Sequence, residues 1–114
     1  MQVDPVWVAG GAAIFAWIAM SRLGKISGEK ARALVGGGAL LIDVRSEAEF
    51  GAGHIAGAMN IPVDRIAARA GELAKRERPI VVYCASGMRS AGAKRALVAA
   101  GIRDVHDLGA MSRW

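Results

Sequence analysis

The sequence predicts an α/β fold, a doubly wound parallel sheet of about five strands preceded by an N-terminal apolar helix. Two continuous apolar runs, "ALLIDV" (39–44) and "IVVYC" (80–84), are typical of strands that are buried on both faces. Segments with helical spacing lie between and after these runs, and strands that alternate with helices pair in parallel. A chain of 114 residues is sufficient for one domain. We expect that domain at residues 25–114 and place residues 1–24 outside it.

The first segment carries no charge from Pro5 to Ser21, a run of 17 residues and the short limit for a membrane-spanning helix. At 1.5 Å per residue it covers about 25 Å of a hydrocarbon core that is roughly 30 Å thick. Trp7 and Trp17 suit anchoring at the two interfaces. No basic residue precedes the segment, and four follow it closely: Arg22, Lys25, Lys30 and Arg32. The uncharged run predicts a membrane anchor, and the charge bias predicts that the C-terminal domain lies in the cytoplasm.

Two other interpretations of this segment stay open. A cleaved secretory signal has a basic start and an A-x-A-like cleavage site, whereas this chain begins "MQVD" and has no A-x-A in the segment. A helix buried in an oligomer is the second alternative. Ala12 and Ala16 form one small-xxx-small step that could pair two copies of the helix.

The segments from residue 26 to residue 79 predict two helical regions and a short strand besides the first apolar run. "ISGEKARALVGGG" (26–38) predicts a short helix with Ser27 near its N-cap and glycines at its end. "MNIP" (59–62) predicts a short strand that proline stops. "VDRIAARAGELAKRERP" (63–79) has helical spacing, but Gly71 interrupts it and favours two short helices.

The last part of the chain predicts one more helix and one more strand. "SAGAKRALVAAG" (90–101) is typical of a helix closed by its final glycine, and "VHDL" (105–108) predicts a short strand. Three apolar residues of the helix are expected to face the core: Ala93, Leu97 and Val98.

Charge and cysteine content exclude several kinds of function. The net charge is +5, but no Lys/Arg run is interleaved with aromatic residues, so nucleic-acid binding has little support. A single cysteine, Cys84, excludes an internal disulfide and a multi-cysteine metal site. The two histidines, His54 and His106, form no metal motif, and we expect neither a metal nor another cofactor.

Cys84 falls at the carboxyl end of a predicted parallel strand, where ligands bind in such sheets. It is followed by a turn and then by the start of a helix. If the turn curls around the sulfur, its amides and the helix N-terminus form an anion cradle that lowers the thiol pKa. Cys84 is then a nucleophile; the alternative is a buried structural cysteine. The turn offers five non-proline amides: Ala85, Ser86, Gly87, Met88 and Arg89.

Three blocks of sequence resemble the rhodanese (thiosulfate sulfurtransferase) family. "LLIDVRSEAEFGAGHIAGAMNIP" (40–62) is similar to its Asp-Val-Arg, Glu-Phe and Gly-His-Ile pattern, and "VVYCASGMRS" (81–90) is similar to its active loop. "GIRDVHDLGAMSRW" (101–114) resembles its closing segment. The resemblance covers residues 25–114, and membrane-tethered members of the family also have a short apolar helix beside a single domain.

The loop spacing separates this family from a related one. The tyrosine-phosphatase signature has five residues between cysteine and arginine, but Arg89 follows Cys84 after four, and Ser90 stands where that signature has arginine. The loop is one residue short for phosphate, and a phosphatase or arsenate reductase is the less favoured alternative. The resemblance implies instead a small ring that holds a cysteine persulfide.

By this resemblance, Cys84 takes a sulfane sulfur from thiosulfate or a related small anionic donor and passes it to a thiol or to a cyanide-type acceptor. The amides of residues 85–89 hold the persulfide. Arg89 either attracts the donor or forms an ion pair that shapes the loop, and Ser86 either donates to the sulfur or serves as a turn former. Ala85 departs from the arginine that the family often has after the cysteine, which puts thiosulfate in question as the preferred donor.

The remaining polar residues of the pattern have structural interpretations. Arg45, which follows Asp43 closely, is expected to pair with Glu47 or Glu49. The Gly-His-Ile segment around His54 is a structural turn in the family pattern. A non-catalytic module that scaffolds a membrane partner remains an alternative function. The expected partners are thus a sulfur donor, a thiol acceptor, a bilayer at residues 5–21 and, through the N-terminal helix, a second copy of the chain.

Overall fold

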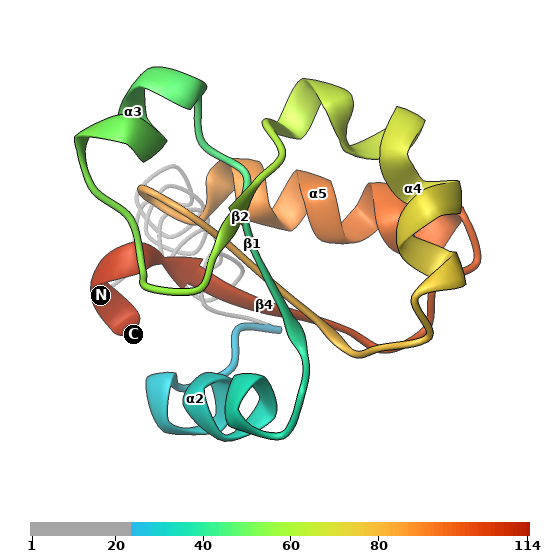
Figure 1. Cartoon of the computed structure of the whole chain (residues 1–114), viewed down its shortest axis with the longest axis horizontal. Coiled ribbons are helices and arrows are strands. Elements are labelled where there is room, and N and C mark those ends of the chain that lie inside the picture. Colours follow the sequence, from blue (N-terminus) through green and yellow to red (C-terminus); the bar gives the residue numbers. More distant parts are fainter. Residues whose placement is uncertain (1–23) are drawn as a thin grey trace, which may run out of the picture.

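The computed structural model describes residues 24–114, and the apolar segment predicted at residues 5–21 lies outside this range. Four strands pair in parallel in the order β2-β1-β3-β4 (Figure 1). The strands are β1 (Leu40–Asp43), β2 (Met59–Asn60), β3 (Ile80–Cys84) and β4 (Val105–Ala110). The helices are α2 (Gly28–Gly36), α3 (Glu47–Ala52), α4 (Ile66–Lys75) and α5 (Met88–Ala99), with 3-10 turns η1 (Val63–Arg65) and η2 (Met111–Arg113). The predicted α/β fold with a parallel sheet is confirmed.

The sheet has four strands within the described residues, where the sequence predicted about five. Beyond β4 the pairing continues only as a single parallel bridge between Lys25 and Asp107. The Ile26 amide donates to the Asp107 carbonyl at 2.9 Å. Because Ser27 is already the N-cap of α2, pairing cannot continue past Ile26.

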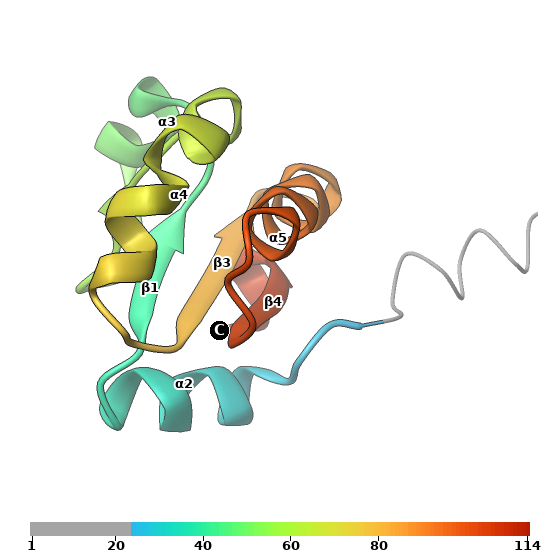
Figure 2. The same ribbon diagram turned by 90° about the vertical axis from the view of Figure 1, so that its right-hand side faces the viewer.

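The two faces of the sheet pack against different helices. Successive side chains of β1 and β3 point to opposite faces, so one strand supplies both packing layers. One face packs against α4 and α5, whereas the other packs against α2 and the C-terminal residues; Figure 2 shows the strands between these two sets of helices. Ile80 and Val82 belong to the first layer, and Val81 and Tyr83 to the second; all four are fully buried. Full burial of an aliphatic side chain of this size contributes about 1.5–3 kcal/mol.

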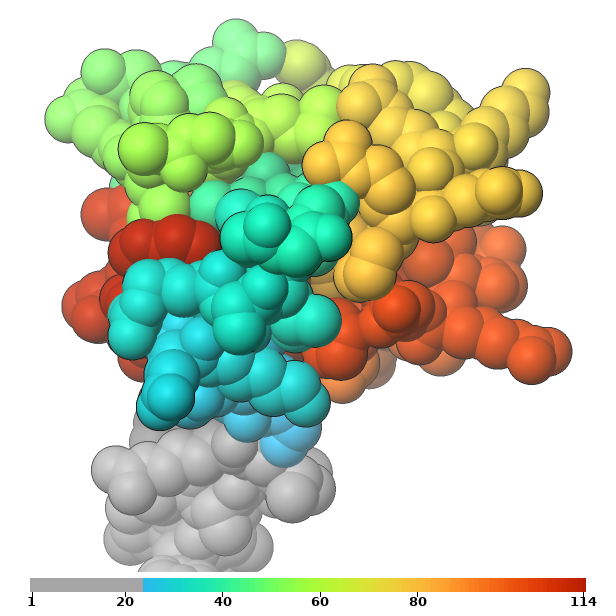
Figure 3. Space-filling model, turned by 60° about the horizontal axis from the view of Figure 1, so that its bottom comes forward, coloured from blue at the N-terminus to red at the C-terminus, as the bar shows by residue number. Residues whose placement is uncertain are grey.

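Helix α2 begins where the sequence predicted it to begin. The Ser27 hydroxyl accepts a hydrogen bond from the Lys30 amide at 3.1 Å and caps the first turn. The helix lies beside the C-terminal residues, which Figure 3 shows in red next to its blue and cyan atoms. A side chain at Gly28 would collide with the Arg113 carbonyl, so this approach requires glycine. The Arg32 guanidinium also donates to the Trp114 carbonyl.

The prediction of two short helices across Gly71 was wrong. Helix α4 runs without a break from Ile66 to Lys75, with η1 directly before it. Gly71 is exposed, and three residues on the opposite side are buried: Ile66, Ala70 and Leu73. Because this apolar stripe packs on the core on both sides of the glycine, tertiary packing outweighs the roughly 1 kcal/mol that glycine costs in a helix.

The inward face of α5 also differs from the prediction at one position. Ala93 and Leu97 are buried as expected, but Val98 is 50% exposed. The third buried residue of the helix is Ser90, which lies one turn closer to the helix N-terminus than Ala93. This turn faces the end of β3, where Cys84 lies.

No helix within residues 24–114 combines the length and the apolar character that crossing a membrane requires.

Candidate active site

Cys84 is the last residue of β3, and its loop leads directly into α5. Its side chain has no exposed surface. The loop turns back at Gly87, which has a φ of 100° and serves as the N-cap of the helix. An L-residue rarely adopts this left-handed conformation, so glycine at this position allows the loop to close around the sulfur.

Two backbone amides point at the sulfur. The Gly87 amide donates to Cys84 Sγ at 2.9 Å and the Ser90 amide at 3.4 Å. The thiol in turn donates to Ser90 Oγ at 3.6 Å, and that hydroxyl donates to the Gly87 carbonyl at 3.2 Å. The first amides of a helix have no partner within the helix, and here they turn toward one sulfur atom.

The electrostatic balance at Cys84 lowers the pKa of its thiol. Burial alone raises the pKa of the thiol, because desolvation penalises the charged form. Hydrogen bonding with the Ser90 amide and side chain, and with the Gly87 and Ser86 amides, acts in the opposite direction, because in the thiolate the Ser90 hydroxyl can turn to donate to the sulfur. The net result is a Cys84 pKa below its ordinary value. The site therefore stabilises a negative charge on a sulfur that is shielded from water.

Only part of the predicted cradle faces the sulfur. Gly87 lies in it as expected, and Ser86 contributes through its backbone while its side chain is exposed. The side chain of Ala85 is exposed and that of Met88 is 69% exposed. Sequence reasoning missed Ser90, which contributes both an amide and a hydroxyl. The signal was available, since Ser90 begins the helix predicted at 90–101 and is the third residue of α5, and amides in the first turn of a helix lack a helical partner.

Arg89 forms an ion pair rather than facing solvent alone. Its two terminal nitrogens contact the two carboxylate oxygens of Glu49 at 2.7 and 3.0 Å. Both side chains are a little over one-third exposed. The Arg89 hydrogen bond, followed by the Ser46 amide, lowers the pKa of Glu49 to about 2. The pair links α3 to the first turn of α5 beside the active loop.

Glu49 is positioned by a capping box that it forms with Ser46. The Ser46 hydroxyl accepts from the Glu49 amide at 3.1 Å, and Glu49 Oε1 accepts from the Ser46 amide at 3.2 Å. This reciprocal pattern starts α3, a helix of six residues.

The expected pairing of Arg45 with Glu47 or Glu49 was wrong. Arg45 pairs with Asp43 instead, at 2.7 Å, and both side chains are buried. The same guanidinium donates to the Gly53 carbonyl at 2.6 Å. Glu47 pairs with Arg65 at the surface. The buried pair thus fixes the turn after β1, because a carboxylate without solvent needs a nearby partner.

The two histidines do not take part in the loop. His54 Nδ1 lies 2.8 Å from the Phe50 carbonyl, and its ring stacks on Phe50 with centroids 3.6 Å apart. This agrees with the structural turn predicted for the segment. His106 Nε2 lies 2.6 Å from Asp104 Oδ1. Among residues 24–114, no group of three or more His, Cys, Asp or Glu side chains is arranged to hold a metal ion.

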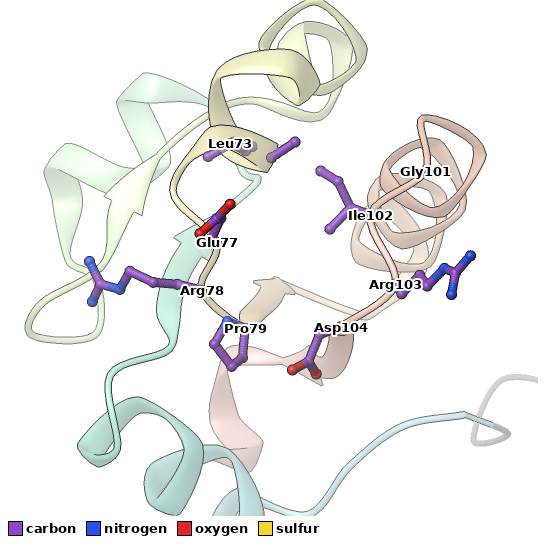
Figure 4. A pocket seen from close by; sticks show the side chains of 9 residues that line it. Leu73, Glu77, Arg78, Pro79, Gly101, Ile102, Arg103 and Asp104 are labelled. Carbon is purple, nitrogen blue, oxygen red and sulfur yellow. The ribbon is translucent and has the colours of Figure 1, made fainter.

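A cavity of about 310 Å³ lies at the opposite end of the sheet. Figure 4 shows Leu73 and Ile102 on its two sides, while the charged ends of Arg78 and Arg103 point away from it. Its lining contains neither a cysteine nor a histidine.

Comparison with known proteins identifies the family. The profile of the rhodanese-like domain matches residues 27–114. The chain belongs to the rhodanese-like family. A thiosulfate sulfurtransferase, GlpE of Pseudomonas fluorescens, is 37% identical over 98 residues, which cover 83% of this chain and 87% of that protein.

Another relative and two solved structures are also similar to the chain. An uncharacterized protein of Bacillus subtilis, YqhL, is 38% identical over 77 residues, although the match spans only 60% of that protein. The human single-domain sulfurtransferase TSTD1 superposes with a TM-score of 0.65 at 28% identity, covering 80% of this chain and 91% of that one. A rhodanese of E. coli with bound anions superposes with a TM-score of 0.61 at 30% identity, covering 66% and 89%. The rhodanese family predicted from residues 40–62 and the active loop is therefore confirmed.

Proposed function

We propose that this rhodanese-like protein is a sulfurtransferase that works through a persulfide on Cys84. One observation carries the proposal: Cys84 Sγ accepts hydrogen bonds from Gly87 and Ser90 at the N-terminus of α5. Such an arrangement stabilises a thiolate, and it can equally stabilise the terminal sulfur of a persulfide, which is also anionic. The relatives that are named sulfurtransferases support the same assignment.

The reaction has two balanced steps. The Cys84 thiolate attacks the outer sulfur of thiosulfate or a related donor, the donor S–S bond breaks, and sulfite leaves with the bonding electron pair. A thiolate or cyanide acceptor then attacks the outer sulfur of the persulfide. That step releases the Cys84 thiolate and carries the sulfur away as a new persulfide or as thiocyanate.

The surroundings of the loop weaken the attraction for anionic donors. Ala85 provides no charge, and the charge of Arg89 is already matched by Glu49. Because the pKa of Glu49 is about 2, this carboxylate stays ionised throughout the physiological range. We propose that thiosulfate is accepted but is a poor donor compared with a monoanionic or uncharged sulfane sulfur compound.

The test is the intact mass of the full chain after treatment with thiosulfate or with an organic persulfide. The wild-type protein should gain one sulfur atom, and Cys84→Ser should gain none. Cyanide should then remove the sulfur and yield thiocyanate. A protein that gains no sulfur from either donor would instead be a non-catalytic module, an alternative that the full burial of Cys84 and the neutral Ala85 favour.

We further propose that residues 5–21 anchor the protein in a membrane, with the rhodanese domain on the cytoplasmic side. The support comes from the uncharged run and from the basic residues on its C-terminal side. The protein should resist carbonate extraction, and a reporter fused after Trp114 should be active only in its cytoplasmic format. Release into the soluble fraction would favour the oligomerisation helix instead, and cleavage near Met20 would favour the signal.

A further inference from the structure

A buried ion pair joins the segment before α2 to β4 and contacts the active loop. Lys25 Nζ contacts Asp107 Oδ2 at 2.5 Å, and the side chains are only 9% and 3% exposed. The other carboxylate oxygen of Asp107 accepts the Gly109 amide at 2.8 Å. Surface ion pairs contribute little to stability, but a charge removed from water needs its partner and further hydrogen bonds. This pair is therefore fixed in place.

The third contact of Lys25 reaches the active loop. Lys25 Nζ donates to the Gly87 carbonyl at 3.0 Å, while the Gly87 amide donates to Cys84 Sγ at 2.9 Å. The carbonyl of Gly87 thus binds the ammonium of Lys25, while its amide binds the reactive sulfur. Gly87 is also the residue with the least intrinsic restriction in the loop, because glycine explores φ and ψ freely. An external contact is needed to hold such a residue in one conformation.

We propose that Lys25 is a positioning residue that holds Gly87 in the conformation in which its amide donates to Cys84 Sγ. Asp107 keeps the ammonium in place, and β4 supports Asp107. Lys25 acts through Gly87 and does not contact the sulfur. Its aliphatic chain packs against Gly109, with Cδ 3.3 Å from the place a Gly109 side chain would occupy, so the ammonium approaches along a defined path. The proposal uses the same site as the sulfur transfer proposed above, but it does not depend on that reaction.

The test compares three variants of the full-length protein by the rate of iodoacetamide alkylation against pH. Lys25→Met combined with Asp107→Asn removes the ammonium without leaving a buried anion, and the methionine keeps the aliphatic packing. The midpoint of the alkylation profile should rise by about one pH unit, a tenfold loss of thiolate below the midpoint. Arg78→Met is the matched control, because its Nε also donates to a loop carbonyl, that of Gly38, but at the other end of the sheet. Its midpoint should not change.

Two results would overturn the proposal. A folded double variant with an unchanged midpoint would show that Gly87 keeps its conformation without Lys25, and an equal rise in Arg78→Met would show a nonspecific effect. If the double variant does not fold, Asp107→Asn alone gives the answer. It weakens the attachment of the ammonium and should raise the midpoint by a few tenths of a unit; an unchanged midpoint contradicts the proposal. Alkylation needs no sulfur donor, so its result is independent of whether the protein transfers sulfur.

Discussion

The two ends of the sheet differ in what they bury. At the carboxyl end lie Cys84 and the buried pair of Asp43 and Arg45, and the loop amides point inward. At the amino end a cavity opens between α4 and the start of β4, with Leu73 and Ile102 facing it and charged groups on its rim. One end of the fold keeps charges and a reactive sulfur away from water, whereas the cavity at the other end is lined by apolar and charged side chains and by no cysteine or histidine. Substitutions at the carboxyl end should therefore affect both the stability of the fold and the reactivity of Cys84, whereas those at the amino end should affect stability alone.

The largest effect is expected from Arg45→Met at the carboxyl end. Asp43 has no exposed surface, so the substitution leaves a buried carboxylate without its cation. Loss of one partner of a buried pair typically costs about 3–5 kcal/mol. The midpoint of urea unfolding should fall accordingly. Arg65→Met is the control, because its pair with Glu47 is 62–70% exposed and should contribute at most about 1 kcal/mol. Equal losses in the two variants would contradict the difference in burial on which the comparison depends.

The next effect concerns the pH dependence of Cys84. Burial raises the thiol pKa, but hydrogen bonding with the amide and side chain of Ser90 helps to lower it below the ordinary value, so the thiolate forms as the pH rises through that lower value. Ser90→Ala removes the hydroxyl but keeps the amide, and the alkylation midpoint should rise by about half to one pH unit. Below the midpoint the rate then falls roughly three- to tenfold. Ser86→Ala is the control, because the exposed Ser86 side chain makes no contact with the sulfur; if it shifts the midpoint as much as Ser90→Ala, the assignment of Ser90 fails.

A smaller effect is expected from Glu49→Gln, which frees the charge of Arg89 beside the loop. Glutamine can still complete the capping box with Ser46, so α3 should remain intact. Sulfur transfer from thiosulfate should speed up by about two- to fivefold at low salt, and the gain should shrink at high ionic strength. Glu47→Gln lies on the same helix and pairs away from the loop with Arg65. A gain in both variants, or one that salt does not reduce, would mean that Glu49 does not select against anionic donors.

The strands and the reactive loop were largely predictable because local signals specify them. Continuous apolar runs predicted β1 and β3, and Cys84 was placed at a strand end from sequence alone. The pairs made by Arg45 and Lys25 were not predictable. Lys25 meets Asp107 only because the segment before α2 packs beside β4. For Arg45, sequence spacing offered Asp43, Glu47 and Glu49 at similar separations, and the burial of Asp43 at the end of β1 decides between them. Helix α4 shows the same limit, because its buried stripe outweighed the local signal of Gly71.

The smallest effect is expected at the amino end, from Glu77→Gly. Glu77 follows the end of α4 and has a φ of 51°, the only positive φ of a non-glycine residue within the described part of the chain. The left-handed conformation costs an L-residue about 1–2 kcal/mol, and helices often end with glycine at this position. Glycine also increases the entropy of the unfolded chain, so the net stabilisation should be about 0.5 kcal/mol, measured as a higher urea midpoint. Glu77 is exposed and makes no side-chain hydrogen bond or ion pair among the described residues, so its loss removes no such interaction. The alkylation midpoint of Cys84 should not move, and a shift would show that the two ends of the sheet are coupled.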